Sequence, residues 1–195
     1  MIIQKVEVTG AREIEQRLGE FKSKAPLVMS RAINRAVSNI RKNLGKEVPQ
    51  HYFISSGTIR GTIHTVNANK GSLSGAVISR GSPIALSKFK VSPNRGVKYT
   101  KKGYSPGVYL AGVKKSGGMK SLSGDPKAFM ADMKSGHTGV WNRVSGKRLP
   151  IKQLYGPSVP QMVKNEKIMA KINKEAGETL EKRISAEVAN ILRKG

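Results

Sequence analysis

The chain has 195 residues, of which 36 are basic and 12 acidic, so its formal net charge is +24. This length is enough for one domain with an ordinary hydrophobic core, and the absence of cysteine excludes disulfide frameworks and thiolate zinc sites. A charge of this size attracts polyanions and repels other copies of the chain, so it predicts nucleic acid or an acidic protein as a partner, with a merely soluble basic surface as the alternative.

The N-terminal quarter of the chain predicts a strand and two helices. Residues 2–8 favour a short strand, and residues 11–21 place apolar side chains at helical spacing. A longer helix is predicted over residues 26–44, because it begins with a proline and carries apolar residues every three or four positions. We expect this helix to end at Gly45, since glycine is a common C-terminal stop.

From residue 58 to 155 the pattern changes to short runs of β-branched and aromatic residues separated by Gly, Ser, Asn and Pro. Such runs are typical of antiparallel strands joined by turns, so we expect a meander. The expected strands are 62–68, 72–80, 96–100, 107–114, 127–133 and 139–144. Residues 92–107 and 114–125 are rich in Gly, Ser, Lys and Pro and are predicted to be mobile basic loops.

The C-terminal segment carries the clearest helical pattern of the chain. Apolar residues recur every three or four positions from Met169 to Ile191, after an entry near Ser158 or Asn165. The predicted fold is therefore α+β, in which an antiparallel β-sheet meander packs with a long helix in the N-terminal half and a long C-terminal helix. We expect a single domain over residues 1–195, with both helices on the same face of the sheet.

The positive charge is concentrated in the middle of the chain. Residues 48–165 hold 19 basic side chains against only two acidic ones. The candidate contacts to DNA or to a neighbouring subunit are Lys98, Lys101, Lys102, Lys114, Lys115, Arg143, Lys147 and Arg148. Plain solvated charge is the alternative for these residues. Tyr99, Tyr104 and Tyr109 lie among the lysines and either stack on bases or fill a sheet edge.

No group of residues in the sequence has the spacing of a catalytic, metal or cofactor site. The histidines His51, His64 and His137 lie far apart, and we expect turn or surface roles for them. Paired acids in a loop and phosphate-binding glycine motifs are also missing. We therefore predict a protein that is not an enzyme and that holds no cofactor and no metal. The chain shows neither an export signal nor an apolar run of 18 residues, so we also predict no membrane association and synthesis in the cytoplasm.

Residues 127–163 read KAFMADMKSGHTGVWNRVSGKRLPIKQLYGPSVPQMV. This segment resembles the signature region of the prophage minor tail protein Z family, the tail-completion proteins of lambda-like long-tailed phages. The matching residues are Ala128, Phe129, Gly136, His137, Gly139, Val140, Arg143, Arg148, Leu149, Pro150, Ile151, Leu154, Gly156, Pro157, Ser158 and Val159. Trp141 stands where the family usually has Phe. Residues 29–44 and 82–89 resemble the first long helix and a short later segment of the family.

The resemblance implies a structural virion protein at the head-proximal end of the tail, arranged as a hexameric ring that supports head–tail joining and DNA passage. The implied partners are the tail terminator, the head–tail connector, the tape-measure protein and double-stranded DNA, bound without sequence preference. The architectural residues of this motif are Gly136, His137, Gly139, Trp141, Leu149, Pro150, Gly156, Pro157 and Ser158. We expect Trp141 to pack between sheet and helix and Ser158 to start the helix. The alternative is a basic nucleic-acid-binding protein that acts alone in the host cytoplasm.

Overall fold

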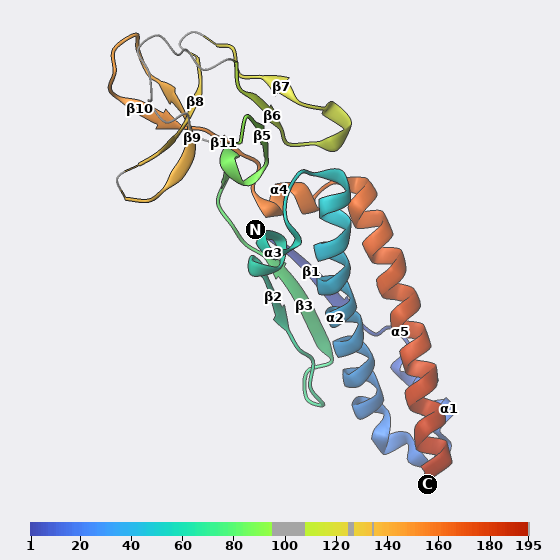
Figure 1. Cartoon of the computed structure of the whole chain (residues 1–195). Helices are drawn as coiled ribbons and strands as arrows, with labels where there is room; N and C mark the ends of the chain where they lie inside the picture. The colour runs from blue at the N-terminus through green and yellow to red at the C-terminus, as the bar shows by residue number, and fades with distance from the viewer. Residues whose placement is uncertain (95–107, 125–126, 134, 195) are drawn as a thin grey trace.

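The computed structural model of the chain is elongated and has two parts, a helical shaft and a β-rich head at one end of it (Figure 1). The described residues are 1–94, 108–124, 127–133 and 135–194. We define the shaft as residues 1–83 and 158–194, and the head as the described residues between 84 and 157. The head is thus a single stretch of chain inserted between two parts of the shaft.

Two long helices lie side by side along the shaft and run in opposite directions (Figure 1). Helix α2 spans Ala25–His51 and helix α5 spans Glu166–Lys194. At 1.5 Å per residue they are about 40 Å and 44 Å long. The buried residues of α2 are Ala25, Val28, Met29, Ser30, Ala32, Ile33, Ala36, Val37, Ile40, Leu44, Gly45, Glu47 and Val48. They cover more than one face of the helix because α2 packs against both α5 and a sheet.

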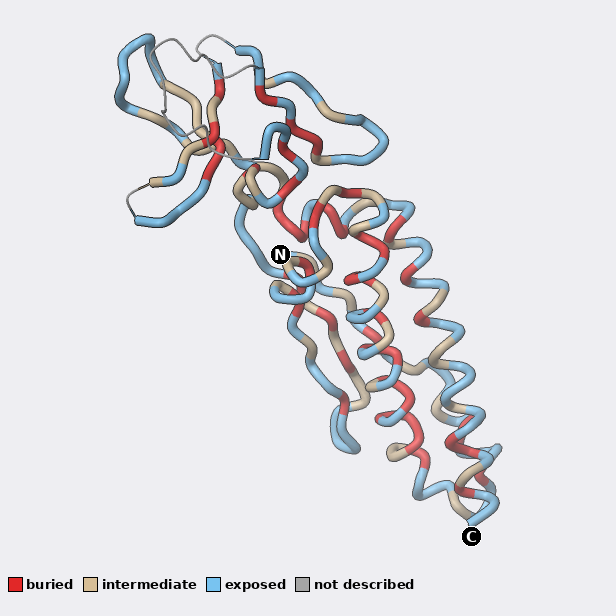
Figure 2. Tube along the Cα trace, in the orientation of Figure 1, coloured by how far each residue is buried: buried red, intermediate tan, exposed pale blue. Residues whose placement is uncertain are grey.

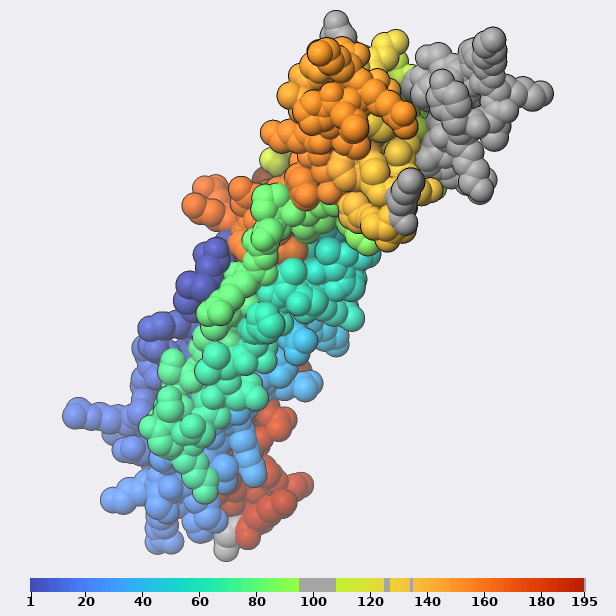
Figure 3. Space-filling view, turned by 90° about the vertical axis from the view of Figure 1, so that its left-hand side faces the viewer, coloured from blue at the N-terminus to red at the C-terminus, as the bar shows by residue number. Residues whose placement is uncertain are grey.

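The shaft sheet has three antiparallel strands in the order β1 (Ile2–Glu7), β3 (Ser74–Ser79) and β2 (Ile63–Val66). The inward side chains of β3 alternate with partly exposed ones, as expected when one sheet face packs on a helix. The other face of the sheet forms the surface of the shaft on the side seen in Figure 3. Asn34 of α2 fixes the β2–β3 hairpin, because its side chain exchanges two hydrogen bonds with the backbone of Ala68, at 2.7 and 2.9 Å.

The far end of the shaft has a small core of its own. The chain there forms helix α1 (Ala11–Leu18) and the 3₁₀ turn η1 (Gly19–Lys24) before it enters α2. The buried side chains of this cluster are Ile14, Leu18, Ala25, Val28, Met29, Val188 and Ile191. The cluster therefore joins α1 and the start of α2 to the end of α5.

The head consists of short antiparallel strands in three sheets. One sheet contains β5 (Lys90–Ser92), β6 (Leu110–Gly112) and β7 (Lys120–Ser121), and another contains β8 (Phe129–Asp132), β9 (Thr138–Arg143) and β10 (Ile151–Gln153). The third pairs β4 (Ile84–Ala85) with β11 (Tyr155–Gly156). Two 3₁₀ turns, η2 (Leu86–Lys88) and η3 (Lys115–Gly117), connect them.

Short helices close the junction between the shaft and the head. These are α3 (Ser56–Gly61), whose cap Ser55 accepts a hydrogen bond from the amide of Thr58, and α4 (Val159–Val163). One continuous hydrophobic cluster runs from α2 through this junction into the head, where it includes Phe89, Tyr109 and Val140. The buried residues follow α2 and the middle of the head, whereas the loops of the head are exposed (Figure 2).

The α+β class, the antiparallel strands and the two long helices agree with the prediction from sequence. The strands do not form one meander, because they are divided among four sheets. Both expected entries to the C-terminal helix exist, since α4 follows Ser158 and α5 follows Asn165. The expected strand 96–100 lies outside the described residues. In the expected loop 114–125, the described part contains η3 and β7.

The prediction that the second helix ends at Gly45 is wrong, because α2 continues to His51. Gly45 is buried against α3, where a β-carbon would lie 2.7 Å from Arg60 Nε, so the glycine serves close packing. Pro49 is also inside the helix and cannot donate to the carbonyl of Gly45. The hydroxyl of Ser56 donates to that carbonyl instead, at 2.6 Å. A side chain of α3 thus replaces the hydrogen bond that the proline removes.

Two glycines give a matched test of packing in the shaft. A β-carbon at Gly75 of β3 would lie 2.7 Å from Cγ2 of Ile33 and 2.8 Å from Cγ2 of Val37, whereas nothing lies within 4 Å of one at Gly177 of α5. We expect Gly75→Ala to lower the free energy of unfolding by about 1–3 kcal/mol through overpacking. Gly177→Ala should raise it by about 1 kcal/mol, because alanine favours the helix. Chemical denaturation of both variants checks this; equal effects of the same sign would contradict the packing described for β3.

Candidate cationic interface

The head is almost free of acidic residues in the part of the chain that the structure describes. Its described residues include ten lysines and arginines but a single acid, Asp132. The basic residues are Lys88, Lys90, Lys114, Lys115, Lys120, Lys127, Arg143, Lys147, Arg148 and Lys152. The shaft mixes both signs: it holds 21 lysines and arginines and ten glutamates, seven of which lie in α1 and α5.

Ion pairs follow the same division. The four ion pairs within the described part of the chain all join shaft residues, and none of the ten head cations lies within 4.0 Å of a described carboxylate. Some of these cations contact aromatic rings instead. The amino groups of Lys90 and Lys115 lie 5.1 and 5.8 Å from the ring centre of Phe53, and the guanidinium of Arg143 lies 5.7 Å from that of Phe129. Such contacts stabilise the side chains but leave their charge unneutralised.

The β9–β10 hairpin presents one group of the predicted contact residues. Lys147 and Arg148 lie on the connecting loop and are exposed, whereas Arg143, the last residue of β9, is half-buried. Val144 and Leu149 on the same loop are 63% and 65% exposed. The loop therefore presents two long, exposed cationic side chains beside exposed apolar ones. This composition suits contact with a polyanion or with another protein.

The glycines of the motif shape the neighbouring β8–β9 hairpin. Gly136 has a φ of +79° and its amide donates to the carbonyl of Met133, which closes the β8–β9 turn. A β-carbon at Gly139 would lie 2.9 Å from Nε1 of Trp141. The indole of Trp141 donates to the carbonyl of Ala131 at 3.3 Å and meets the ring of His137 edge-on at 6.0 Å between centres. Gly139 thus makes room for the indole on the sheet.

The expectation that Trp141 packs between sheet and helix is wrong. Strand β9 lies in the outer sheet of the head, away from α2 and α5 (Figure 1). The indole is half-buried among β8, β9 and the turn before β9. His137 in turn contacts Gln153 of β10 at 2.8 Å. The aromatic and polar residues of the motif therefore hold the three strands of the head together.

The end of the motif connects the head to α4 as expected. A β-carbon at Gly156 would lie 2.6 Å from the ring of Phe89, so only glycine fits between that ring and the backbone of β11. Ser158 is the N-cap of α4 and forms a capping box with Gln161, whose side chain accepts the amide of Ser158 at 2.9 Å. Leu149 is exposed, and the carbonyl of Pro150 accepts the amide of Val144 at 3.1 Å to close the hairpin loop.

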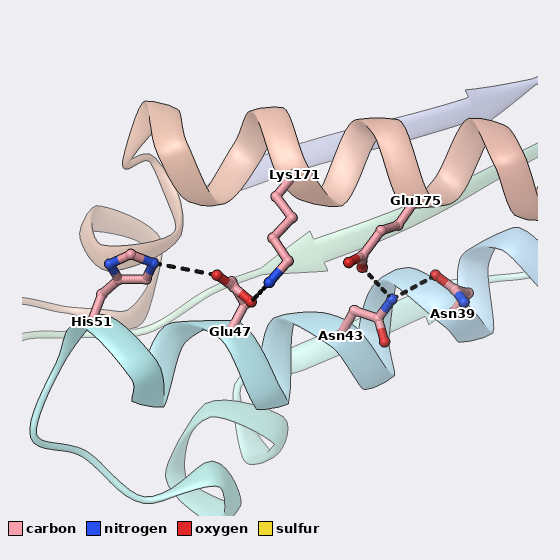
Figure 4. Close-up of polar contacts among 6 residues, drawn as sticks. All are labelled: Asn39, Asn43, Glu47, His51, Lys171 and Glu175. Atoms are coloured by element: carbon pink, nitrogen blue, oxygen red, sulfur yellow. Dashed lines mark hydrogen bonds and ion pairs between the residues drawn. The ribbon is translucent and has the colours of Figure 1, made fainter.

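A polar network joins α2 to α5 near the head (Figure 4). Glu47 is only 7% exposed, and its carboxylate accepts hydrogen bonds from Lys171 at 2.5 Å and from His51 at 3.3 Å. Burial raises the pKa of Glu47, but the hydrogen bonds and charges of Lys171 and His51 outweigh burial and hold the pKa below its ordinary value. One turn along α2, the amide of Asn43 donates to Glu175 at 2.6 Å.

A second buried carboxylate joins the same two helices near their other ends. Glu187 of α5 is 5% exposed and pairs with Arg31 of α2 at 3.0 Å and with Arg183 at 2.7 Å. The basic partners of both glutamates are about half-exposed, so each charge pair stays hydrated on one side. Buried carboxylates of α2 and α5 are thus neutralised within the shaft, in contrast to the cations of the head.

A groove lies where the head meets the shaft, and we call it the junction groove. Its volume is about 700 Å³. The charged residues that line it are His51, Lys114, Lys115, Lys164, Glu166 and Lys167. Lys115 lies in η3 and Lys114 precedes it, whereas Lys164 follows α4 and Lys167 lies in the first turn of α5.

The predicted contact residues therefore fall into two groups. Lys114 and Lys115 line the junction groove, and Arg143, Lys147 and Arg148 belong to the β9–β10 hairpin. Lys98, Lys101 and Lys102 lie outside the described residues. Tyr109 is 1% exposed, so its ring has no face open for a base.

Sequence reasoning missed the pairing of Glu47 with His51 and the contribution of Lys164 and Lys167 to the groove. Glu47 and His51 are four residues apart, the spacing of neighbours on a helix face, but the helix was expected to end before them. The surface role predicted for His51 is incomplete for the same reason, because it is half-buried against Glu47. The two lysines had no signal in the sequence, since only the fold brings them to η3.

Within the described residues, no cluster of three or more histidine, aspartate or glutamate side chains could hold a metal ion. Neither long helix, nor any other helix in this part of the chain, is apolar enough over a sufficient length to cross a membrane.

The fold and this surface define the class of an elongated α+β protein with a helical shaft that carries charges of both signs and a cationic β-rich head. The chain matches the family described as prophage minor tail protein Z (GPZ) over residues 8–194, and it therefore belongs to that family. It is accordingly a structural minor tail protein of a phage and is associated with the virion. The comparison with curated proteins gave no match, and neither did the comparison with solved structures.

The charge network of Glu47 predicts a pH dependence of stability. Because the pKa of Glu47 is lower in the folded chain than its ordinary value of 4.5, its contribution is complete above pH 4.5 and is lost as the pH falls through the folded pKa. We expect Glu47→Gln to lower the free energy of unfolding by about 1 kcal/mol at pH 7. Urea unfolding at several pH values checks this, with the exposed Glu178→Gln as control. A difference from wild type that persists undiminished at pH 2 would contradict the assignment.

Proposed function

We propose that this chain is the tail-completion protein of a long-tailed phage, placed at the head-proximal end of the tail. It assembles there as a hexameric ring, supports head–tail joining and allows the DNA to pass. Its neighbours are the tail terminator, the head–tail connector and the tape-measure protein. Before it joins the particle, it is present in the host cytoplasm. Membership of the minor tail protein Z family supports the tail as its place of action.

The observation that carries the proposal is the concentration of unneutralised cations in the head. Ten basic side chains without a carboxylate partner among the described residues favour a polyanion as the group that neutralises them. Double-stranded DNA carries one charge per about 1.7 Å of its axis, so it is the densest polyanion that a tail contains. Contacts of this kind go to phosphates and carry no sequence preference.

The division of charge also suits a ring. Six copies with a net charge of +24 each bring on the order of a hundred positive charges together, so their mutual repulsion opposes assembly. If the heads face the channel, DNA offsets this repulsion, whereas the shafts, whose buried carboxylates are already neutralised, contact each other. An elongated subunit whose acid-poor head lies at one end is consistent with this arrangement.

The presence of the protein in particles decides between this proposal and a basic DNA-binding protein that acts alone. We expect purified virions to contain the chain, and particles made without it to lose infectivity. Mass spectrometry of purified particles and complementation of a deletion mutant measure these two quantities. Particles that lack the protein and deliver their genomes normally would overturn the proposal, and tight duplex binding by a monomer that never enters particles would favour the alternative.

Charge reversal on the β9–β10 hairpin tests the role of the head. We expect Lys147→Glu with Arg148→Glu to leave the fold intact, because both residues are exposed, and to lower infectivity at least about tenfold. Lys174→Glu with Lys182→Glu on α5 changes the net charge equally on exposed shaft positions and serves as the control. Plaque counts and incorporation into particles are measured for both. Equal effects of the two pairs would remove the hairpin from the mechanism.

A further inference from the structure

The junction groove collects four lysines from two distant parts of the chain. Lys114 and Lys115 belong to the head, whereas in the shaft Lys164 follows α4 and Lys167 lies in the first turn of α5. Backbone contacts fix the two sides. Tyr52, just after α2, forms a β-bridge with Lys114, and the amide of Phe53 donates to the carbonyl of Val113 at 2.9 Å.

The shaft side of the groove is held by the turn that joins the two helices. The amide of Lys164 donates to the carbonyl of Pro160 at 3.0 Å, and the side chain of Asn165 accepts the amide of Lys167 at 3.1 Å. These contacts place the backbone of both lysines, whereas their side chains remain exposed. The groove is thus a fixed frame that carries four adaptable ammonium groups.

The charge of the groove is not balanced from within. Glu166 is the acid among its lining residues, against four lysines. None of the four lysines makes an ion pair with a described carboxylate. Glu47 lies close by, but its oxygens are already occupied by Lys171 and His51. Lysines gathered in one groove repel each other, so an anionic ligand is favoured there.

The lining also favours a phosphate chain over an acidic protein segment. Protein docking sites depend on aromatic or aliphatic side chains that fill pockets. The aromatic residue at this groove is Tyr52, which is only 4% exposed, and the remaining lining residues are polar or charged. Lysine is a common phosphate ligand that acts as a point charge, and phosphates follow one another along a DNA strand in a regular row.

We propose that the junction groove binds the phosphate backbone of double-stranded DNA through Lys114, Lys115, Lys164 and Lys167. This inference rests on the proposed function and extends it, because it adds the shaft to the DNA-binding surface. The groove takes one edge of the duplex, with two lysines from the head and two from the shaft on the same strand. DNA bound in this way connects the head to the α4–α5 end of the shaft.

Duplex binding by the purified full-length chain tests the groove. The probe is a fluorescein-labelled 20-base-pair duplex, measured by anisotropy between 50 and 300 mM salt. We expect Lys164→Gln with Lys167→Gln to weaken binding at least about tenfold at 100 mM salt and to reduce the slope of log K against log salt by about two, since each phosphate contact contributes about 0.9. Lys174→Gln with Lys182→Gln on α5 is the matched control, and it should change the slope by much less.

Glu166 provides a change of opposite sign at the same place. Glu166→Gln should tighten duplex binding severalfold, because it removes the acid that lines the groove. Thermal unfolding of every variant shows whether it remains folded, and the opposite shifts of the two variants cannot both come from lost structure. Equal salt slopes for the lysine pair and its control, or no tightening by Glu166→Gln, would overturn the proposal. So would groove-dependent binding of a polyglutamate peptide together with groove-independent binding of the duplex.

The measurement is independent of the test of the proposed function. Particles that deliver DNA without this protein would remove the tail role but leave groove-dependent duplex binding unchanged. Conversely, loss of infectivity on deletion with no groove dependence of duplex binding would retain the tail role and remove this site.

Discussion

Helix α2 is enclosed by the shaft sheet on one side and by α5 on the other, so it must bury apolar side chains over much of its circumference. The shape of the shaft depends on this enclosure. The sheet can approach α2 closely because Gly75 has no side chain, and the hairpin between β2 and β3 is fixed to α2 by Asn34. The helix α5 then covers the remaining apolar surface of α2 and leaves the shaft about as long as its helices.

The seam between α2 and α5 is polar at defined positions. Glu47 and Glu187 are buried near its two ends, and each has one basic partner across the seam in the observed register, Lys171 for Glu47 and Arg31 for Glu187. A shift of α5 by one turn would separate these two pairs and leave each carboxylate with only the partner on its own helix, His51 or Arg183. The buried charges therefore help to fix the register of α2 against α5. Apolar side chains alone would fix this register less strictly. Among the described residues, the cations of the head have no carboxylate within 4.0 Å.

The sequence was sufficient to predict the elements that depend on local periodicity. Both long helices and the α+β class follow from apolar spacing, and the cap at Ser158 follows from its position before α4. Gly45 misled because the usual effect of a glycine on a helix is cancelled by α3, whose Arg60 and Ser56 contact the same turn. This compensation comes from tertiary contacts with α3, so the sequence around Gly45 gives no sign of it. The division of the strands into several sheets, and the meeting of Lys164 with Lys114, depend on long-range packing for the same reason.

The head enters and leaves the shaft through paired strands. Ile84 and Ala85 of β4 lie opposite Gly156 and Tyr155 of β11, so the first and last residues of the inserted segment are neighbours. The inserted segment therefore returns to the shaft beside the point where it left. The path of the chain through the shaft is interrupted at one place only, between Pro83 and Ser158.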